Sequence, residues 1–157
     1  MLKYVNTSVV FREIPDETTL SINISNCPNH CPGCHSQYLW EDIGEELDEA
    51  ALDNLIAGIG SDITCICFMG GDSDLKRLQQ LADYLHSSYP DYKVGWYSGR
   101  IRLPGSFDRS RFDYIKLGPY LAHLGPLNEP TTNQRMYRKG ADGSYEDITS
   151  LFWKKRQ

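Results

Sequence analysis

Apolar positions along this chain follow two different periods. Residues 20–24 are apolar at every second position, which is typical of a strand with one buried face, and residues 9–11 predict a strand before it. Residues 63–69 form a nearly continuous apolar run that predicts a strand buried on both faces. Residues 92–97 and 113–117 predict two more strands. A helical period appears over residues 46–59 and again from Leu75 to Leu85.

The order of these elements is strand, loop, helix, strand, helix, strand, which favours parallel βα units. The last third of the chain, from Gly118 onward, is rich in Pro, Gly and Asn, and we expect loops with short strands there. The 157 residues contain no sequence repeat and no convincing linker, so we predict one α/β domain over residues 1–157.

Composition narrows the class of protein. Hydrophobic residues make up 40% and charged residues 24%, as in soluble globular proteins. The net charge of −5 argues against a nucleic-acid partner, which would select a basic surface. No apolar run reaches the length of a membrane span, and the N-terminal residues do not resemble a signal peptide. Five cysteines, an odd number, predict a reducing cytoplasmic location and metal or thiol chemistry.

Three of the cysteines, Cys27, Cys31 and Cys34, lie within eight residues. Thiolates at this spacing suit three corners of a cubane 4Fe-4S cluster, whereas clusters that only transfer electrons normally have four cysteine ligands. The fourth iron would then be open, which is how a metal site becomes catalytic. The alternative is a zinc site completed by His30 or His35. The crowding of all candidate ligands into one turn argues against zinc.

Two further loops are expected beside the cysteine loop. The cysteine loop follows the strand that ends near Ile24, the segment 70–72 follows the strand that ends at Met69, and Ser98 follows the strand 92–97. In parallel βα architectures the carboxyl ends of the strands share one rim, where chemistry gathers. We therefore expect these three loops to meet.

These motifs resemble those of the radical S-adenosylmethionine superfamily, and more narrowly the small activating proteins of anaerobic ribonucleoside-triphosphate reductase. The resemblance covers residues 6–138 in order. It is carried by Asn26-Cys27, Cys31-Pro32-Gly33-Cys34, Trp40, Met69-Gly70-Gly71-Asp72, Trp96-Tyr97-Ser98-Gly99 and Asn133-Gln134-Arg135. Many superfamily members have an aromatic residue where this chain has Gly33, but the reductase activators also have Pro-Gly there.

The resemblance implies an incomplete parallel (β/α) barrel, because the chain is short for a closed barrel of eight units. It also implies two cofactors, a 4Fe-4S cluster on Cys27, Cys31 and Cys34, and S-adenosylmethionine on the open iron. The resemblance implies three sets of contacts with S-adenosylmethionine: near the adenine from Gly33, Cys34 and His35, at the methionine part from Gly70, Gly71 and Asp72, and at the ribose or carboxylate from Ser98.

The implied partners are the large glycyl-radical subunit of the reductase and a low-potential electron donor such as flavodoxin or ferredoxin. Three alternatives remain open: activation of another glycyl-radical enzyme, radical chemistry on a small molecule as in the deazapurine synthases, and a non-catalytic iron–sulfur or zinc module. Cys65 and Cys67 alternate along a strand, so we expect them to be core residues. Arg135 would bind a carboxylate or an acidic neighbour.

Overall fold

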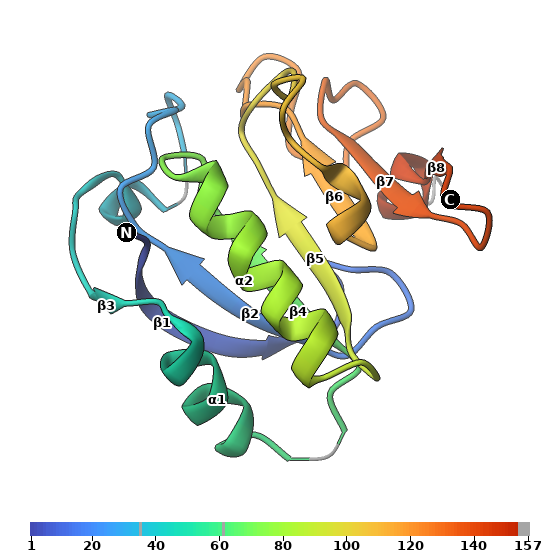
Figure 1. The fold of residues 1–157 in the computed structure, drawn as a ribbon. Helices are drawn as coiled ribbons and strands as arrows, with labels where there is room; N and C mark the ends of the chain where they lie inside the picture. Colours follow the sequence, from blue (N-terminus) through green and yellow to red (C-terminus); the bar gives the residue numbers. More distant parts are fainter. Residues whose placement is uncertain (35, 61, 154–157) are drawn as a thin grey trace.

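A mixed β-sheet forms the centre of the protein. The computed structural model describes residues 1–34, 36–60 and 62–153, and within them the sheet has eight strands in the order β3-β1-β2-β4-β5-β6-β7-β8 (Figure 1). The strands are β1 (Lys3–Val10), β2 (Thr19–Ile24), β3 (Glu45–Glu46), β4 (Cys65–Met69), β5 (Lys93–Tyr97), β6 (Tyr114–Leu117), β7 (Arg135–Lys139) and β8 (Tyr145–Asp147).

Only the middle of the sheet is parallel. β2, β4, β5 and β6 run parallel, whereas β1 and β3 on one side and β7 and β8 on the other pair antiparallel. The helix α1 (Glu49–Ala57) connects β2 to β4, and α2 (Leu75–Ser88) connects β4 to β5. Both helices cover the same face of the sheet (Figure 1). Three short 3-10 turns complete the elements of the described residues: η1 (Gln37–Trp40), η2 (Arg109–Arg111) and η3 (Thr149–Phe152).

The prediction of an incomplete parallel (β/α) barrel is wrong. A barrel of this kind repeats a helix after each parallel strand, whereas the described residues contain two α-helices beside a mixed sheet. The connection from β5 to β6 contains only the three-residue turn η2 in place of a helix. Antiparallel strands then occupy both sides of the parallel strands, so the sheet continues outward on each side instead of curling into repeated βα units.

Two element boundaries also differ from the expectation. The helix expected over residues 46–59 begins at Glu49, because the Asp48 side chain caps it by accepting a hydrogen bond from the Ala51 backbone N–H at 2.8 Å. Residues 45–46 pair with β1 as the short strand β3. The first strand covers Lys3–Val10, where residues 9–11 were expected, and the side chain of Phe11 beyond it is exposed.

The sheet has an apolar layer on each face. The larger layer packs the apolar residues of β2, β4 and β5 against α1 and α2, and Phe68 and Trp96 are among its largest fully buried side chains. The opposite layer is smaller and holds Cys65 and Cys67 of β4 with Ile14 and Ile148 from the segments that cover this face. The second face is therefore covered by loop segments, and its apolar layer is the smaller of the two.

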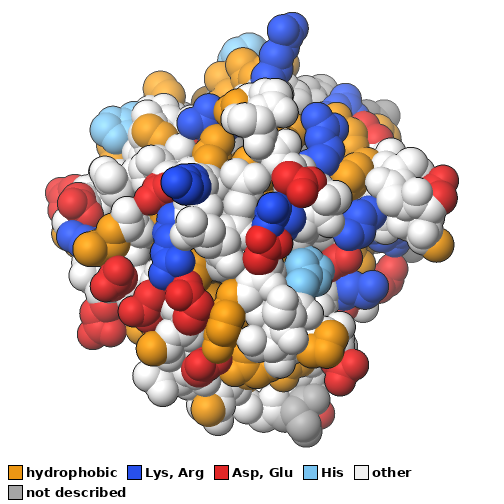
Figure 2. All heavy atoms as spheres, in the orientation of Figure 1, with side chains coloured by type: hydrophobic (Ala, Val, Ile, Leu, Met, Phe, Trp, Pro, Cys, Tyr) orange, Lys and Arg blue, Asp and Glu red, His pale blue; other side chains and the backbone are white. Residues whose placement is uncertain are grey.

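The outer surface over the helices is an ordinary solvated one. On the face drawn in Figure 2, acidic and basic side chains are interspersed and hydrophobic side chains form small separate patches. The helices in the described residues lack the length and apolar character that a membrane-spanning helix needs.

Candidate metal centre

The cysteine loop begins where β2 ends, and the backbone fixes its start. The Asn26 N–H donates to the carbonyl of Glu41 at 2.9 Å, and the Cys27 N–H donates to the carbonyl of Leu39 at 2.9 Å. Asn26 has a positive φ of 58°, which an asparagine tolerates better than most residues. These contacts hold the first cysteine of the loop against the segment 39–41.

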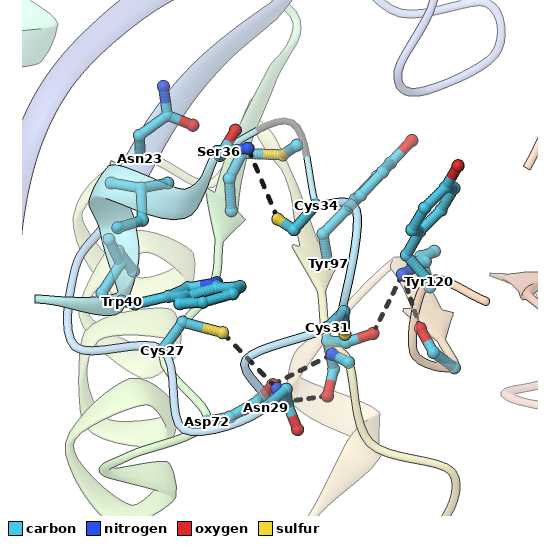
Figure 3. A pocket seen from close by; sticks show the side chains of 18 of the residues that line it. Asn23, Cys27, Asn29, Cys31, Cys34, Ser36, Trp40, Asp72, Tyr97 and Tyr120 are labelled. Carbon is cyan, nitrogen blue, oxygen red and sulfur yellow. Dashed lines mark hydrogen bonds between the residues drawn. The ribbon is translucent and has the colours of Figure 1, made fainter. Parts of the chain in front are cut away.

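Cys27, Cys31 and Cys34 all line one cavity of about 210 Å³ (Figure 3). Each cysteine is half-buried. The Asn29 side-chain amide donates to the Cys27 sulfur at 3.6 Å, and the Ser36 backbone N–H donates to the Cys34 sulfur at 3.4 Å.

The three sulfurs surround a space but do not converge on one point. Four ligands of a single zinc ion would lie about 2.0–2.3 Å from it. In residues 1–34, 36–60 and 62–153, no three His, Cys, Asp or Glu side chains are grouped to hold one ion. His30 instead stacks on Trp40, with ring centroids 4.8 Å apart. The other candidate histidine, His35, lies outside the described residues. The described residues therefore form no closed zinc site.

A row of side chains from four parallel strands forms another wall of the cavity. Asn23 of β2 is paired with Met69 of β4, Met69 with Tyr97 of β5, and Tyr97 with Lys116 of β6. All four side chains line the cavity. The row lies on the loop-covered face, near the carboxyl ends of the strands, where the sequence predicts the functional loops to meet.

The Gly70–Gly71 turn brings the end of β4 to this wall. Gly70 has a φ of 120°, and an added Cβ would lie 3.1 Å from the Ile24 carbonyl oxygen, so glycine is required by backbone conformation and close approach together. Its carbonyl accepts the Trp96 indole N–H at 2.8 Å. Gly70 lines the cavity, whereas the Cβ position of Gly71 points toward Leu78 of the core.

Asp72 is buried, with 4% of its surface exposed, and connects the three loops. One carboxylate oxygen accepts from the Ser98 hydroxyl at 2.6 Å. The other accepts from the Asn29 amide at 2.6 Å and from the Gly99 backbone N–H at 2.9 Å. The Arg100 guanidinium lies 3.9 Å from the first oxygen and adds an opposite charge. The sequence predicted that these loops meet, but not that Asp72 would hold them together.

These contacts bear on the expected roles of two residues. Ser98 has 1% of its surface exposed; its hydroxyl donates to Asp72 and accepts from the Arg100 backbone N–H at 3.0 Å. Asp72 and Ser98 thus line the cavity while their polar atoms bond mainly to each other and to the loops. Gly33, one of the three residues expected near the adenine, is exposed, and its Cβ position faces the Tyr120 ring at 3.2 Å.

Lys116 is a cavity residue that sequence reasoning missed. It has 8% of its surface exposed, and its ammonium group donates to the carbonyls of Ser98 at 3.2 Å and Gly118 at 2.8 Å. Burial lowers the pKa of Lys116 to about 8, although the nearby Asp72, Cys31, Cys27 and Cys34 act to raise it. The sequence does contain a signal for this burial, because Lys116 lies between Ile115 and Leu117 in a short buried strand.

The two remaining cysteines lie elsewhere. Cys65 and Cys67 are fully buried in the smaller apolar layer, as expected for core residues. Burial raises the pKa of both thiols well above the ordinary range, which keeps them protonated and unreactive. Arg135 lies outside the cavity and contacts the acidic neighbour Asp147 at 3.7 Å.

The family model described as a 4Fe-4S single cluster domain matches residues 18–103, which is more than half of the 157 residues. The chain belongs to this family. The matched segment of this cluster-domain protein contains the cysteine loop, the Gly70–Asp72 turn and Ser98. Comparisons with curated proteins and with solved structures gave no match.

The cavity has the donor set that a 4Fe-4S cluster needs. It offers three half-buried thiols, two of which already accept hydrogen bonds. It also offers the indole of Trp40, whose buried Nε1 has no hydrogen-bond partner in the described part of the chain. The residues therefore fit an iron–sulfur cluster held by Cys27, Cys31 and Cys34.

Proposed function

We propose that this cluster-domain protein is a radical S-adenosylmethionine enzyme that generates a glycyl radical on anaerobic ribonucleoside-triphosphate reductase. The observation that carries the proposal is the number of cysteines at the cavity. Cys27, Cys31 and Cys34 line it, whereas Cys65 and Cys67 lie buried in the apolar layer and do not. A cluster held by three cysteines keeps one iron available for the amino and carboxylate groups of S-adenosylmethionine.

The walls of the cavity supply groups of the right chemistry for that ligand. The Lys116 ammonium has three N–H groups and donates two to backbone carbonyls, so a third remains for a carboxylate. Gln134 lines the same cavity, and its side-chain amide has both donors and an acceptor. Asn23 lines it too, although its amide donates to the Asn6 side chain at 2.6 Å. Asp72 places negative charge behind the wall, which favours a cationic amino or sulfonium group nearby.

When bound and reduced, the cluster would supply one electron to the sulfonium, so that the C5′–S bond breaks to give methionine and a 5′-deoxyadenosyl radical. That radical would take a hydrogen atom from the Cα of a glycine in the partner, yielding 5′-deoxyadenosine and a glycyl radical. The electron would come from a low-potential donor such as flavodoxin or ferredoxin. The protein's own task is to position these groups and exclude water.

The test is anaerobic reconstitution with iron and sulfide, followed by reduction with S-adenosylmethionine and the candidate reductase. We expect 5′-deoxyadenosine by chromatography and a glycyl-radical doublet by electron paramagnetic resonance (EPR). Cys34→Ser should abolish both products, and the matched variant Cys67→Ser should retain them. 5′-Deoxyadenosine without a doublet would point to a small-molecule substrate or another glycyl-radical enzyme. A loaded cluster that yields neither product would refute the proposal and indicate a non-catalytic module.

A further inference from the structure

The side chain of Asn29 lies between the cysteine loop and the strand wall of the cavity. Its amide nitrogen donates to the Cys27 sulfur at 3.6 Å and to a carboxylate oxygen of Asp72 at 2.6 Å (Figure 3). A side-chain amide has two N–H groups, so one is available for each acceptor. Asp72 decides which way the amide points, because an amide oxygen in the place of the nitrogen would face the carboxylate.

Asp72 anchors the Asn29 amide from outside the cysteine loop. The buried carboxylate also accepts from the Ser98 hydroxyl at 2.6 Å and from the Gly99 backbone N–H at 2.9 Å. The Asn29 nitrogen packs closely on Gly99, where an added Cβ would lie 2.6 Å from it. The N–H group that points at the Cys27 sulfur is therefore held by segments that are remote from the cysteine loop in the sequence.

We propose that the Asn29 amide keeps its hydrogen bond to the Cys27 sulfur when the 4Fe-4S cluster is bound and thereby raises the reduction potential of the cluster. Uptake of one electron from a low-potential donor makes the cluster and its ligands more negative by one charge. An N–H donor to a ligand sulfur therefore stabilises the reduced form more than the oxidised form. Asn29 acts through Cys27 and is a positioning residue. Its role requires the cluster alone and does not depend on S-adenosylmethionine cleavage.

The experiment compares the wild type with Asn29→Leu, which keeps a side chain of similar size and removes both N–H groups. Ser98→Ala is the matched control, because it takes a donor from Asp72 but none from Cys27. The three proteins are loaded anaerobically, checked for equal iron and sulfide content, and titrated potentiometrically with EPR detection and without S-adenosylmethionine. We expect a more negative midpoint potential for Asn29→Leu, and the wild-type potential for Ser98→Ala.

Two outcomes of this titration overturn the proposal. One is a wild-type midpoint potential in Asn29→Leu. The other is an equal shift in Ser98→Ala, because the effect would then arise from the loss of a donor to Asp72 and not from the bond to the sulfur. A shift confined to Asn29→Leu, in a protein that does not cleave S-adenosylmethionine, would refute the proposed function and leave this inference standing.

A second measurement covers the case in which Asn29→Leu does not hold the cluster. The wild type, labelled with nitrogen-15 in its asparagine side-chain amides, is reduced and studied by pulsed EPR. We expect a magnetic coupling between the cluster and an amide nitrogen, together with an exchangeable proton that disappears in deuterium oxide. Both signals should persist in Asn23→Gln, which removes the label from the cavity-lining Asn23. Absence of the coupling in the wild type, or its loss in Asn23→Gln, overturns the proposal.

Discussion

Lys116 offers the sharpest test of the electrostatics of the cavity. Its ammonium group is buried, and burial lowers its pKa from 10.5 to about 8. The folded protein therefore binds this proton less tightly than the unfolded chain does. Between about pH 8 and 10.5 the unfolded chain holds more protons at this site, so the free energy of unfolding should rise with pH across that interval.

The size of this rise follows from the two pKa values. At about 1.36 kcal/mol per pKa unit, the interval from 10.5 to about 8 corresponds to about 3 kcal/mol, most of it gained by about pH 10. Lys116→Met removes the titrating group. It also leaves the Ser98 and Gly118 carbonyls without their donor, but that loss is nearly the same at every pH and cancels when the pH dependences are compared.

The assay is urea unfolding of the cluster-free protein at about pH 7 and about pH 10. We expect the stability difference between wild type and Lys116→Met to move by about 2–3 kcal/mol in favour of wild type at the higher pH. Lys93→Met is the control, because Lys93 is an exposed lysine on the neighbouring strand β5. Parallel pH profiles for wild type and Lys116→Met would show that Lys116 is not desolvated, and the argument would fail.

Three further substitutions test contacts that position the loops of the site and the start of α1. Asp72→Asn places an amide where Gly99 and Asn29 donate, and should lower the free energy of unfolding by about 2–3 kcal/mol in urea titrations. Unchanged stability would contradict the conclusion that Asp72 holds the three loops together. Gly70→Ala should cost about 1–3 kcal/mol, whereas Gly105→Ala, which meets nothing within 4 Å, should not. Asp48→Ala removes the cap of α1 and should cost about 1 kcal/mol, seen as a lower melting temperature.

Elements with a strong local pattern were predictable from the sequence. β2, β4, β5, β6 and α2 lie within a few residues of their expected positions. A buried strand or an amphipathic helix can be predicted from the spacing of apolar residues within its own segment. The barrel prediction failed because sheet closure depends on which strands occupy the sides of the parallel core. The antiparallel pairing of β1 with β2 and of β7 with β6 is decided by contacts between distant segments, which no local pattern records.

The site likewise has features that the sequence predicts and features that it does not. The meeting of the cysteine loop, Gly70 and Ser98 at one rim follows from strand order and was expected. The burial of Lys116 was not expected. Loops cover its cavity, and the sequence does not predict the course of those loops. Asp72 was singled out for a ligand contact, whereas the structure gives most of its lone pairs to protein donors. A buried carboxylate must be satisfied even when no ligand is bound, and the loops around Asp72 meet that need.

Asn29 explains how a short loop reaches a defined position over the sheet. Its side-chain amide donates both to the Cys27 sulfur at 3.6 Å and to Asp72 at 2.6 Å, so one group joins the metal side of the cavity to the strand side. The amide also occupies the space above Gly99, where an added Cβ would lie 2.6 Å from it. The cysteine spacing therefore determines which metal group the loop suits, while Asp72 and Gly99, remote in sequence, determine where the loop holds it.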